Sequence, residues 1–172
     1  MPAYHSAFNS LQVKKIGSMA ILPVKTKKGM AALKEDGDDI IDEALALFRA
    51  NVFFRNFEIQ GDADRVLIYL ILFISECLNK INKNTSYNDG QKILGALGLE
   101  NNFVVPGDAG FPLAALYSTP ANRNEADTLR QYIGQLRQEL VNRLIPILYP
   151  TQSMPSKWWM SFQKRKFMNK SF

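Results

Sequence analysis

Apolar residues recur at helical spacing in the stretch that follows the first acidic cluster of the chain. From Ile40 to Phe54 they fall at positions 40, 41, 44, 45, 48 and 52, which places them on one face of a helix. Asp38 and Asp39 precede this stretch, and their carboxylates can accept hydrogen bonds from the N–H groups of a first turn. The pattern predicts a helix from Ile40, followed by an aromatic cluster over residues 51–57.

The most apolar segment of the chain lies over residues 62–81. Its run of nine apolar residues, 66–74, is unbroken, and Cys77, Leu78 and Ile81 continue it at helical spacing. Short apolar runs also form buried strands, but a pattern that extends over about 20 residues favours a helix buried on every side. The run is half as long as the roughly 18 residues that a membrane span requires. We therefore expect a core helix.

Two more helices and an irregular loop are predicted after a polar turn at residues 82–90. Residues 91–97 have the pattern of a short helix that Gly98 ends. Residues 99–121 form an irregular loop because proline or glycine recurs every few positions, at Pro106, Gly107, Gly110, Pro112 and Pro120. Asn122 and Glu125 then resemble a capping box, and the long amphipathic helix after them should end or kink at Pro146.

The ends of the chain are basic and the middle is acidic. Residues 1–34 carry six lysines and no acid, residues 140–172 carry six lysines or arginines and no acid, and all 16 acids lie between them. Such ends favour an acidic partner, which could be nucleic acid, a lipid surface or a protein. A solvated surface that keeps the protein soluble is the alternative interpretation.

Together these patterns predict a mainly α fold, a compact single-domain helical bundle over residues 1–172 around one buried central helix. The chain has 172 residues, 47% of them apolar, which is enough for a sizeable core. Residues 1–37 are expected to form an extended basic arm with one anchored stretch at 19–22. No secretory signal is recognisable at the start and Cys77 is the only cysteine, so we expect an intracellular protein without a disulfide.

The residues needed for catalysis or cofactor binding are not found together in the sequence. His5 is the only histidine, in a terminus expected to be mobile, and Cys77 lies in the most buried segment. There are too few Cys and His residues for structural zinc, and no glycine-rich phosphate loop is present. We expect no enzyme, no cofactor and no metal. One acidic cluster is interpreted as helix-capping charge; it comprises Asp36, Asp38, Asp39, Asp42 and Glu43.

The basic aromatic segment at residues 155–172 is the strongest candidate for a partner-binding site. Successive residues of a helix point about 100° apart, so Trp158 and Trp159 cannot both enter one core from the short helix that Ser156 can cap. Tryptophan and arginine are enriched where interfaces concentrate their binding energy. The alternative is that Trp158, Trp159 and Phe162 close the core while the cations stay solvated. The candidate residues are Lys157, Trp158, Trp159, Lys164, Arg165 and Lys166.

Seven stretches in order along the chain resemble a known family, the roughly 21-kDa subunit 3 of the actin-related protein 2/3 complex. The last of them contains Pro-Ser-Lys-Trp-Trp at 155–159 and Phe-Met-Asn-Lys-Ser at 167–171. The others lie within residues 1–6, 42–54, 63–78, 106–113, 120–122 and 136–139. Residues 25–37, the turn at 82–90 and Pro146 depart from the family pattern.

The resemblance implies a compact helical subunit of a cytoplasmic, seven-subunit assembly of the actin cytoskeleton that nucleates branched actin filaments. It implies hetero-oligomeric contact with the larger actin-related subunit and help in engaging the actin filament. It also implies that ATP is bound by the actin-related subunits and not by this chain, and that neither nucleic acid nor membrane insertion is involved. The alternatives from other classes are a basic nucleic-acid-binding module and a small enzyme.

Overall fold

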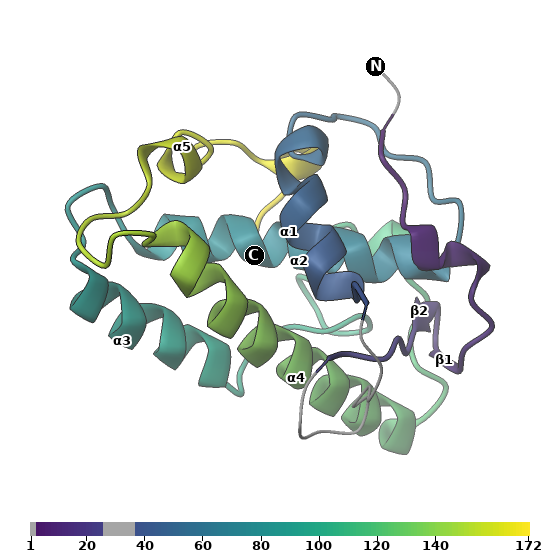
Figure 1. Cartoon of the computed structure of the whole chain (residues 1–172). Coiled ribbons are helices and arrows are strands. Elements are labelled where there is room, and N and C mark those ends of the chain that lie inside the picture. Colours follow the sequence, from purple (N-terminus) through teal and green to yellow (C-terminus); the bar gives the residue numbers. More distant parts are fainter. Residues whose placement is uncertain (1–2, 26–36) are drawn as a thin grey trace.

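The computed structural model describes residues 3–25 and 37–172 and is mostly helical, as the sequence predicts. Figure 1 shows the helices packed around α2, with the N-terminal segment along one end. The α-helices are α1 (Ile40–Asn51), α2 (Asp62–Lys80), α3 (Tyr87–Leu99), α4 (Arg123–Leu148) and α5 (Lys157–Met160). Short 3-10 turns occur at η1 (Ala7–Ser10), η2 (Ala114–Leu116) and η3 (Phe167–Asn169). Strands β1 (Lys15–Ile16) and β2 (Met19–Ala20) form an antiparallel hairpin.

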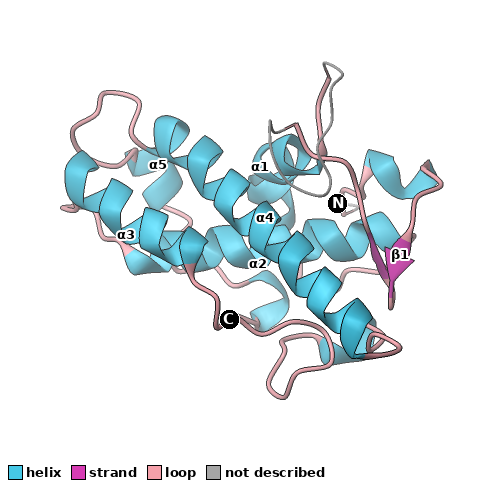
Figure 2. Ribbon diagram, turned by 90° about the horizontal axis from the view of Figure 1, so that it is seen from below, coloured by secondary structure: helices cyan, strands magenta, loops and turns pink. Residues whose placement is uncertain are grey.

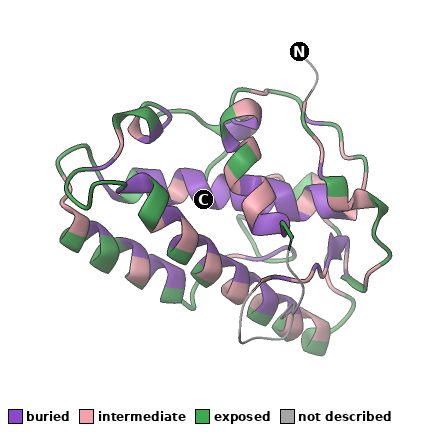
Figure 3. Ribbon diagram, viewed as in Figure 1, coloured by how far each residue is buried: buried purple, intermediate pink, exposed green. Residues whose placement is uncertain are grey.

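Helix α2 carries the most apolar segment, and the alternative of a strand there is wrong. Every side chain from residue 66 to residue 74 is fully buried, as the colouring of Figure 3 shows along this helix. Helices α1, α3 and α4 and strand β2 all contact it. Apolar residues on all sides of α2 therefore meet protein on all sides, which is the condition for such a helix to be stable in water. No helix among the described residues is long and apolar enough to cross a membrane.

Helix α1 begins where the acidic residues predict and ends before Phe54. The Asp39 carboxylate accepts hydrogen bonds from the backbone N–H groups of Ile41 and Asp42, and the backbone N–H of Asp39 donates to the Asp42 carboxylate. The helix ends at Asn51, whose side-chain amide pairs with both backbone groups of Tyr4. Asp36, another member of the acidic cluster, lies outside the described residues.

Helix α3 is longer at both ends than the sequence indicates. It begins at Tyr87, inside the stretch expected to be a polar turn, because the Ser86 hydroxyl caps it by accepting a hydrogen bond from the Asp89 N–H. Gly98 does not end it. A Cβ atom there would lie 3.2 Å from Cγ2 of Val141, so this glycine lets α4 approach α3 closely (Figure 2).

Helix α4 begins after Asn122, which caps it as predicted, and passes through Pro146 to Leu148. A proline removes one backbone hydrogen bond to the carbonyl four residues earlier, here that of Asn142. Asn142 and Pro146 are both exposed, so water can hydrogen-bond to this carbonyl. The prediction that α4 ends near Ile145 is therefore wrong by about one turn.

The N-terminal segment is attached to the helices at more points than the extended arm with one anchored stretch that the sequence analysis predicts. Besides residues 19–22, Ile16 and Val24 are buried, and polar groups hold residues 4–9 to α1 and α2. His5 was expected in a mobile terminus; instead its Nδ1 lies 2.7 Å from Oδ2 of the fully buried Asp64. The same carboxylate accepts a hydrogen bond from the Ser6 backbone N–H. Residues 1–2 and 26–36 of the predicted arm lie outside the described residues.

An ion pair between the partly exposed Arg143 and the fully buried Asp39 carboxylate joins α4 to α1. The guanidinium of Arg143 donates to Asp39 over 2.6 and 2.8 Å, and it also reaches Asp42 and Glu139. Burial of the Asp39 carboxylate would raise its pKa, but the hydrogen bonds from Arg143 and from backbone N–H groups outweigh this and lower the pKa below the ordinary 3.8. We call Arg143, Asp39, Asp42 and Glu139 the α1–α4 ion cluster.

Candidate partner-binding surface

The two adjacent tryptophans have different environments. Ser156 caps α5 as predicted, and from this helix Trp159 points inward, 8% exposed, with its ring stacked on Phe48 at a centroid distance of 5.9 Å. Trp158 is 45% exposed. Phe162 is also buried, so the alternative in which all three aromatic side chains close the core applies to Trp159 and Phe162 but not to Trp158.

A second segment joins Trp158 at the surface. Phe53, just beyond the end of α1, is 52% exposed, and its ring meets the edge of Phe162 at a centroid distance of 5.7 Å. Phe162 contacts Trp158 in the same way at 5.3 Å. Phe162 therefore bridges two exposed aromatic side chains that lie about 100 residues apart in the sequence.

Two arginines extend this aromatic row at its ends. The guanidinium carbon of Arg49 lies 4.9 Å from the ring centroid of Trp158, and that of Arg165 lies 4.9 Å from the ring centroid of Phe53. Stacking of this kind is favourable because the face of an aromatic ring is electronegative. The resulting order along the surface is Arg49, Trp158, Phe162, Phe53 and Arg165.

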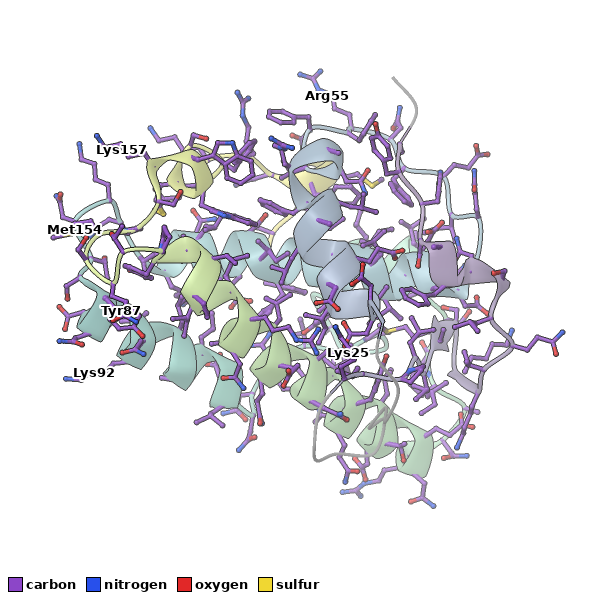
Figure 4. The ribbon with its side chains drawn as sticks, viewed as in Figure 1. Lys25, Arg55, Tyr87, Lys92, Met154 and Lys157 are labelled. Atoms are coloured by element: carbon purple, nitrogen blue, oxygen red, sulfur yellow. The ribbon has the colours of Figure 1, made fainter. Side chains whose placement is uncertain are left out.

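Further cations lie around this row. Lys157, Lys164, Lys166 and Arg55 are exposed, and Figure 4 shows Lys157 and Arg55 along the same edge of the molecule. Within the described part of the chain, none of these cations, nor Arg49 or Arg165, forms an ion pair. We call this surface the basic aromatic face; its exposed residues are Arg49, Phe53, Arg55, Lys157, Trp158, Lys164, Arg165 and Lys166.

Five of the six candidate residues from the sequence are exposed on this face, and Trp159 lies beneath it. The sequence analysis missed the part that α1 contributes, which is Arg49, Phe53 and Arg55. The aromatic cluster at 51–57 was visible in the sequence, but no sequence pattern places it beside α5. Only the packing of Phe48 and Phe53 on Trp159 and Phe162 does so.

The groups considered for catalysis have structural roles. Burial raises the pKa of the Cys77 thiol, so the nucleophilic thiolate is disfavoured. His5 is engaged by Asp64, and Asp39 and Asp42 are engaged by Arg143. Among residues 3–25 and 37–172 there is no group of three His, Cys, Asp or Glu side chains that could hold a metal ion.

A surface hollow with a volume of about 640 Å³ runs along α4. It brings together Glu100, Asp127 and Arg130 with several carboxamide side chains. Arg130 is already engaged, because its guanidinium donates to the Phe103 carbonyl and to Asp108. The hollow therefore shows no paired acid and base free to act on a substrate.

Comparison with known proteins identifies the family. The model of the family P21-Arc, described as the ARP2/3 complex ARPC3 (21 kDa) subunit, matches residues 1–172. The chain belongs to this family. It is 54% identical over 175 residues to actin-related protein 2/3 complex subunit 3 of Schizosaccharomyces pombe, with 99% of each chain covered. The subunit 3 protein of Dictyostelium discoideum is 49% identical, with 98% of each chain covered.

The resemblance drawn from seven short stretches is thereby confirmed for the P21-Arc family. A protein of Caenorhabditis elegans named as the probable subunit 3 is 47% identical over 174 residues, with 99% of this chain and 95% of that protein covered. These relatives are named as subunits of a complex and not as enzymes. The departures noted at residues 25–37 and 82–90 and at Pro146 do not affect membership of the P21-Arc family.

Proposed function

We propose that this protein is a non-catalytic structural subunit of the actin-related protein 2/3 complex and contributes there to the nucleation of branched actin filaments. The observation that carries the proposal is the match of the P21-Arc family over residues 1–172, together with relatives of the same name that are similar over nearly their whole length. The family match gives no support to the alternative of a nucleic-acid-binding module. The subunit acts in the cytoplasm, within the actin cytoskeleton.

The subunit functions as one domain over residues 1–172 and binds its partners through its surface. It contacts the larger actin-related subunit and helps the assembly engage the acidic actin filament. The basic ends of the chain support this role, because exposed cations attract an acidic partner over a distance. The candidate residues Lys157, Trp158, Trp159, Lys164, Arg165 and Lys166 belong to or support this binding surface.

The test is to purify the tagged protein at its endogenous level and to identify the proteins that accompany it. We expect both actin-related subunits and the remaining subunits of the assembly in constant proportion. Purification of the protein without actin-related subunits would contradict the proposal. The same preparation tests whether the assembly engages actin filaments. The complex that contains the tagged subunit should sediment with filamentous actin, and the free subunit should sediment with it more weakly.

A further inference from the structure

Most arginines of this protein that pack against other elements use their N–H groups within the chain. Arg65 donates to Asp62 and to two backbone carbonyls, Arg137 to Tyr69 and Leu97, and Arg143 to three carboxylates and a carbonyl. Each of these guanidinium groups donates to oxygen acceptors of the same chain, although the buried Nε of Arg137 has no hydrogen-bond partner among the described residues. These arginines join elements of the fold to one another.

Arg49 and Arg165 are also held in place, but in another way. Each guanidinium is stacked on an aromatic ring, and neither side chain donates a hydrogen bond to any residue that the structure describes. Stacking restricts the guanidinium while leaving its edge, which carries the N–H donors, available. The two side chains are therefore pre-organised for acceptors on another molecule, and the acceptor that fits a guanidinium edge with two parallel hydrogen bonds is a carboxylate.

The exposed aromatic side chains of the basic aromatic face indicate whether the interface with the partner is stable or transient. Trp158 and Phe53 are 45% and 52% exposed and are joined through the buried ring of Phe162, so two large aromatic side chains of one row lie partly in water in the isolated subunit. Cations surround this row. Tryptophan and arginine at the centre of a patch are typical of the residues that dominate stable interfaces. Burial of the aromatic row favours a permanent neighbour in an assembly over a filament that is bound and released.

From this geometry we propose that Arg49 and Arg165 bind carboxylates on the acidic surface of a neighbouring subunit, which also covers Trp158 and Phe53. The proposal rests on the proposed function and adds the partner's chemistry and the residues of α1 that contribute to the same face. Arg49 and Arg165 determine the specificity of this docking through the shape of their donors, beyond the charge that they carry.

The experiment separates shape from charge by replacing arginine with lysine. The variants are Arg49→Lys/Arg165→Lys and Arg49→Ala/Arg165→Ala, expressed as full-length tagged subunits in cells in place of the native one. The control is Lys92→Ala, which removes an exposed charge on α3, where Figure 4 shows Lys92 far from Arg55. For each variant we measure the fraction of the tagged subunit that co-purifies with the actin-related subunits, and the melting temperature of the free subunit.

We expect both arginine variants to lower incorporation by about tenfold, since each loses bidentate contacts at the centre of an interface. The control should change incorporation by less than about twofold, because exposed charges distant from an interface contribute little. All free variants should melt close to the wild type. The lysine variant keeps the charge and most of the stem, so it remains informative if the alanine variant folds poorly.

Three outcomes overturn the inference. Normal incorporation of the lysine variant would show that charge alone is sufficient. Normal incorporation of the alanine variant with weaker sedimentation on actin filaments would place the filament, and not a subunit, on this face. Binding of the free wild-type subunit to phosphatidylserine vesicles that both arginine variants lose, with their incorporation unchanged, would indicate a lipid surface. If even the wild type fails to co-purify with the complex, the proposed function itself has failed.

Discussion

The α1–α4 ion cluster and the basic aromatic face use arginine in opposite ways. Arg143 is surrounded by carboxylates, its side chain is 18% exposed, and it joins two helices of the same chain. Arg165 is stacked on Phe53 at the surface and has no carboxylate partner among the described residues. An arginine therefore stabilises the fold where its N–H donors are satisfied within the chain, as for Arg143. Where only the plane of the guanidinium is in contact, as for Arg165, the N–H donors are available to a partner.

The largest effect on stability should come from Trp159, which is buried beneath the basic aromatic face. Trp159→Ala removes a buried ring stacked on Phe48, and a truncation of this kind costs about 3–5 kcal/mol in the free energy of unfolding. Trp158→Ala should cost less than about 1.5 kcal/mol, because nearly half of this side chain is already in water, and should mainly lower incorporation into the complex. Denaturant unfolding of both variants measures the difference, and equal losses would contradict the division of roles.

Loss of the arginine of the α1–α4 ion cluster should come next. Arg143→Ala leaves the fully buried carboxylate of Asp39 without its cation, and breaking such a pair costs about 3 kcal/mol. Arg165→Ala is the matched control, and its free energy of unfolding should change by less than about 1 kcal/mol, since it loses only an exposed stacking contact. Thermal unfolding of the two variants tests the contrast between the cluster and the face directly.

Acid should weaken the ion cluster before it affects the face. The pKa of Asp39 is lowered in the folded state, so its contribution to stability is fully present above the ordinary pKa of 3.8 and is lost as the pH falls through the lower folded value. Asp39→Asn keeps a good helix cap but has no charge to titrate. Unfolding curves of variant and wild type between neutral and strongly acidic pH should differ most at neutral pH and converge in acid. A constant difference at every pH would show that the ion pair contributes nothing.

The smallest effect on stability should come from the exposed lysines of the basic aromatic face. Lys164→Ala/Lys166→Ala should change the free energy of unfolding by less than about 0.5 kcal/mol, because neither side chain is paired within the described chain. Co-purification with the complex should be lower than for the wild type at low salt, and the difference should shrink as salt is raised, because salt screens the attraction that the lysines add for an acidic partner. Destabilisation of the free subunit by more than 1 kcal/mol would show that these lysines have a structural role.

Hydrophobic periodicity predicted the helices well where the segment had a clear apolar pattern and a clear N-cap residue. The segment of α2 has apolar residues on all sides, and Asp39, Asn122 and Ser156 cap helices where the sequence places them. Two of the errors came from glycine and proline. Gly98 was taken to end one helix and Pro146 to end or kink another, but each is accommodated by its surroundings, Gly98 by contact with Val141 and Pro146 by exposure to water.

The candidate surface was predicted only in part, for a related reason. The cations and tryptophans of residues 155–172 form a compact pattern in the sequence, so they could be recognised. Arg49 and Phe53 belong to the same face but lie about 100 residues earlier, and their proximity to Trp158 depends on packing over Phe162. Local patterns do not contain this information, because it arises from contacts between distant segments.

The attachment of the N-terminal segment has a consequence for how the chain folds during synthesis. Residues 4–9 leave the ribosome before α1 and α2, yet the side chains that satisfy the backbone groups of Tyr4 and Ser6 are supplied by Asn51 and Asp64, 47 and 58 positions later. Such distant pairings form slowly, because the intervening loop must close before any contact is gained. This segment must therefore wait for α1 and α2 before it can attach to the body of the protein.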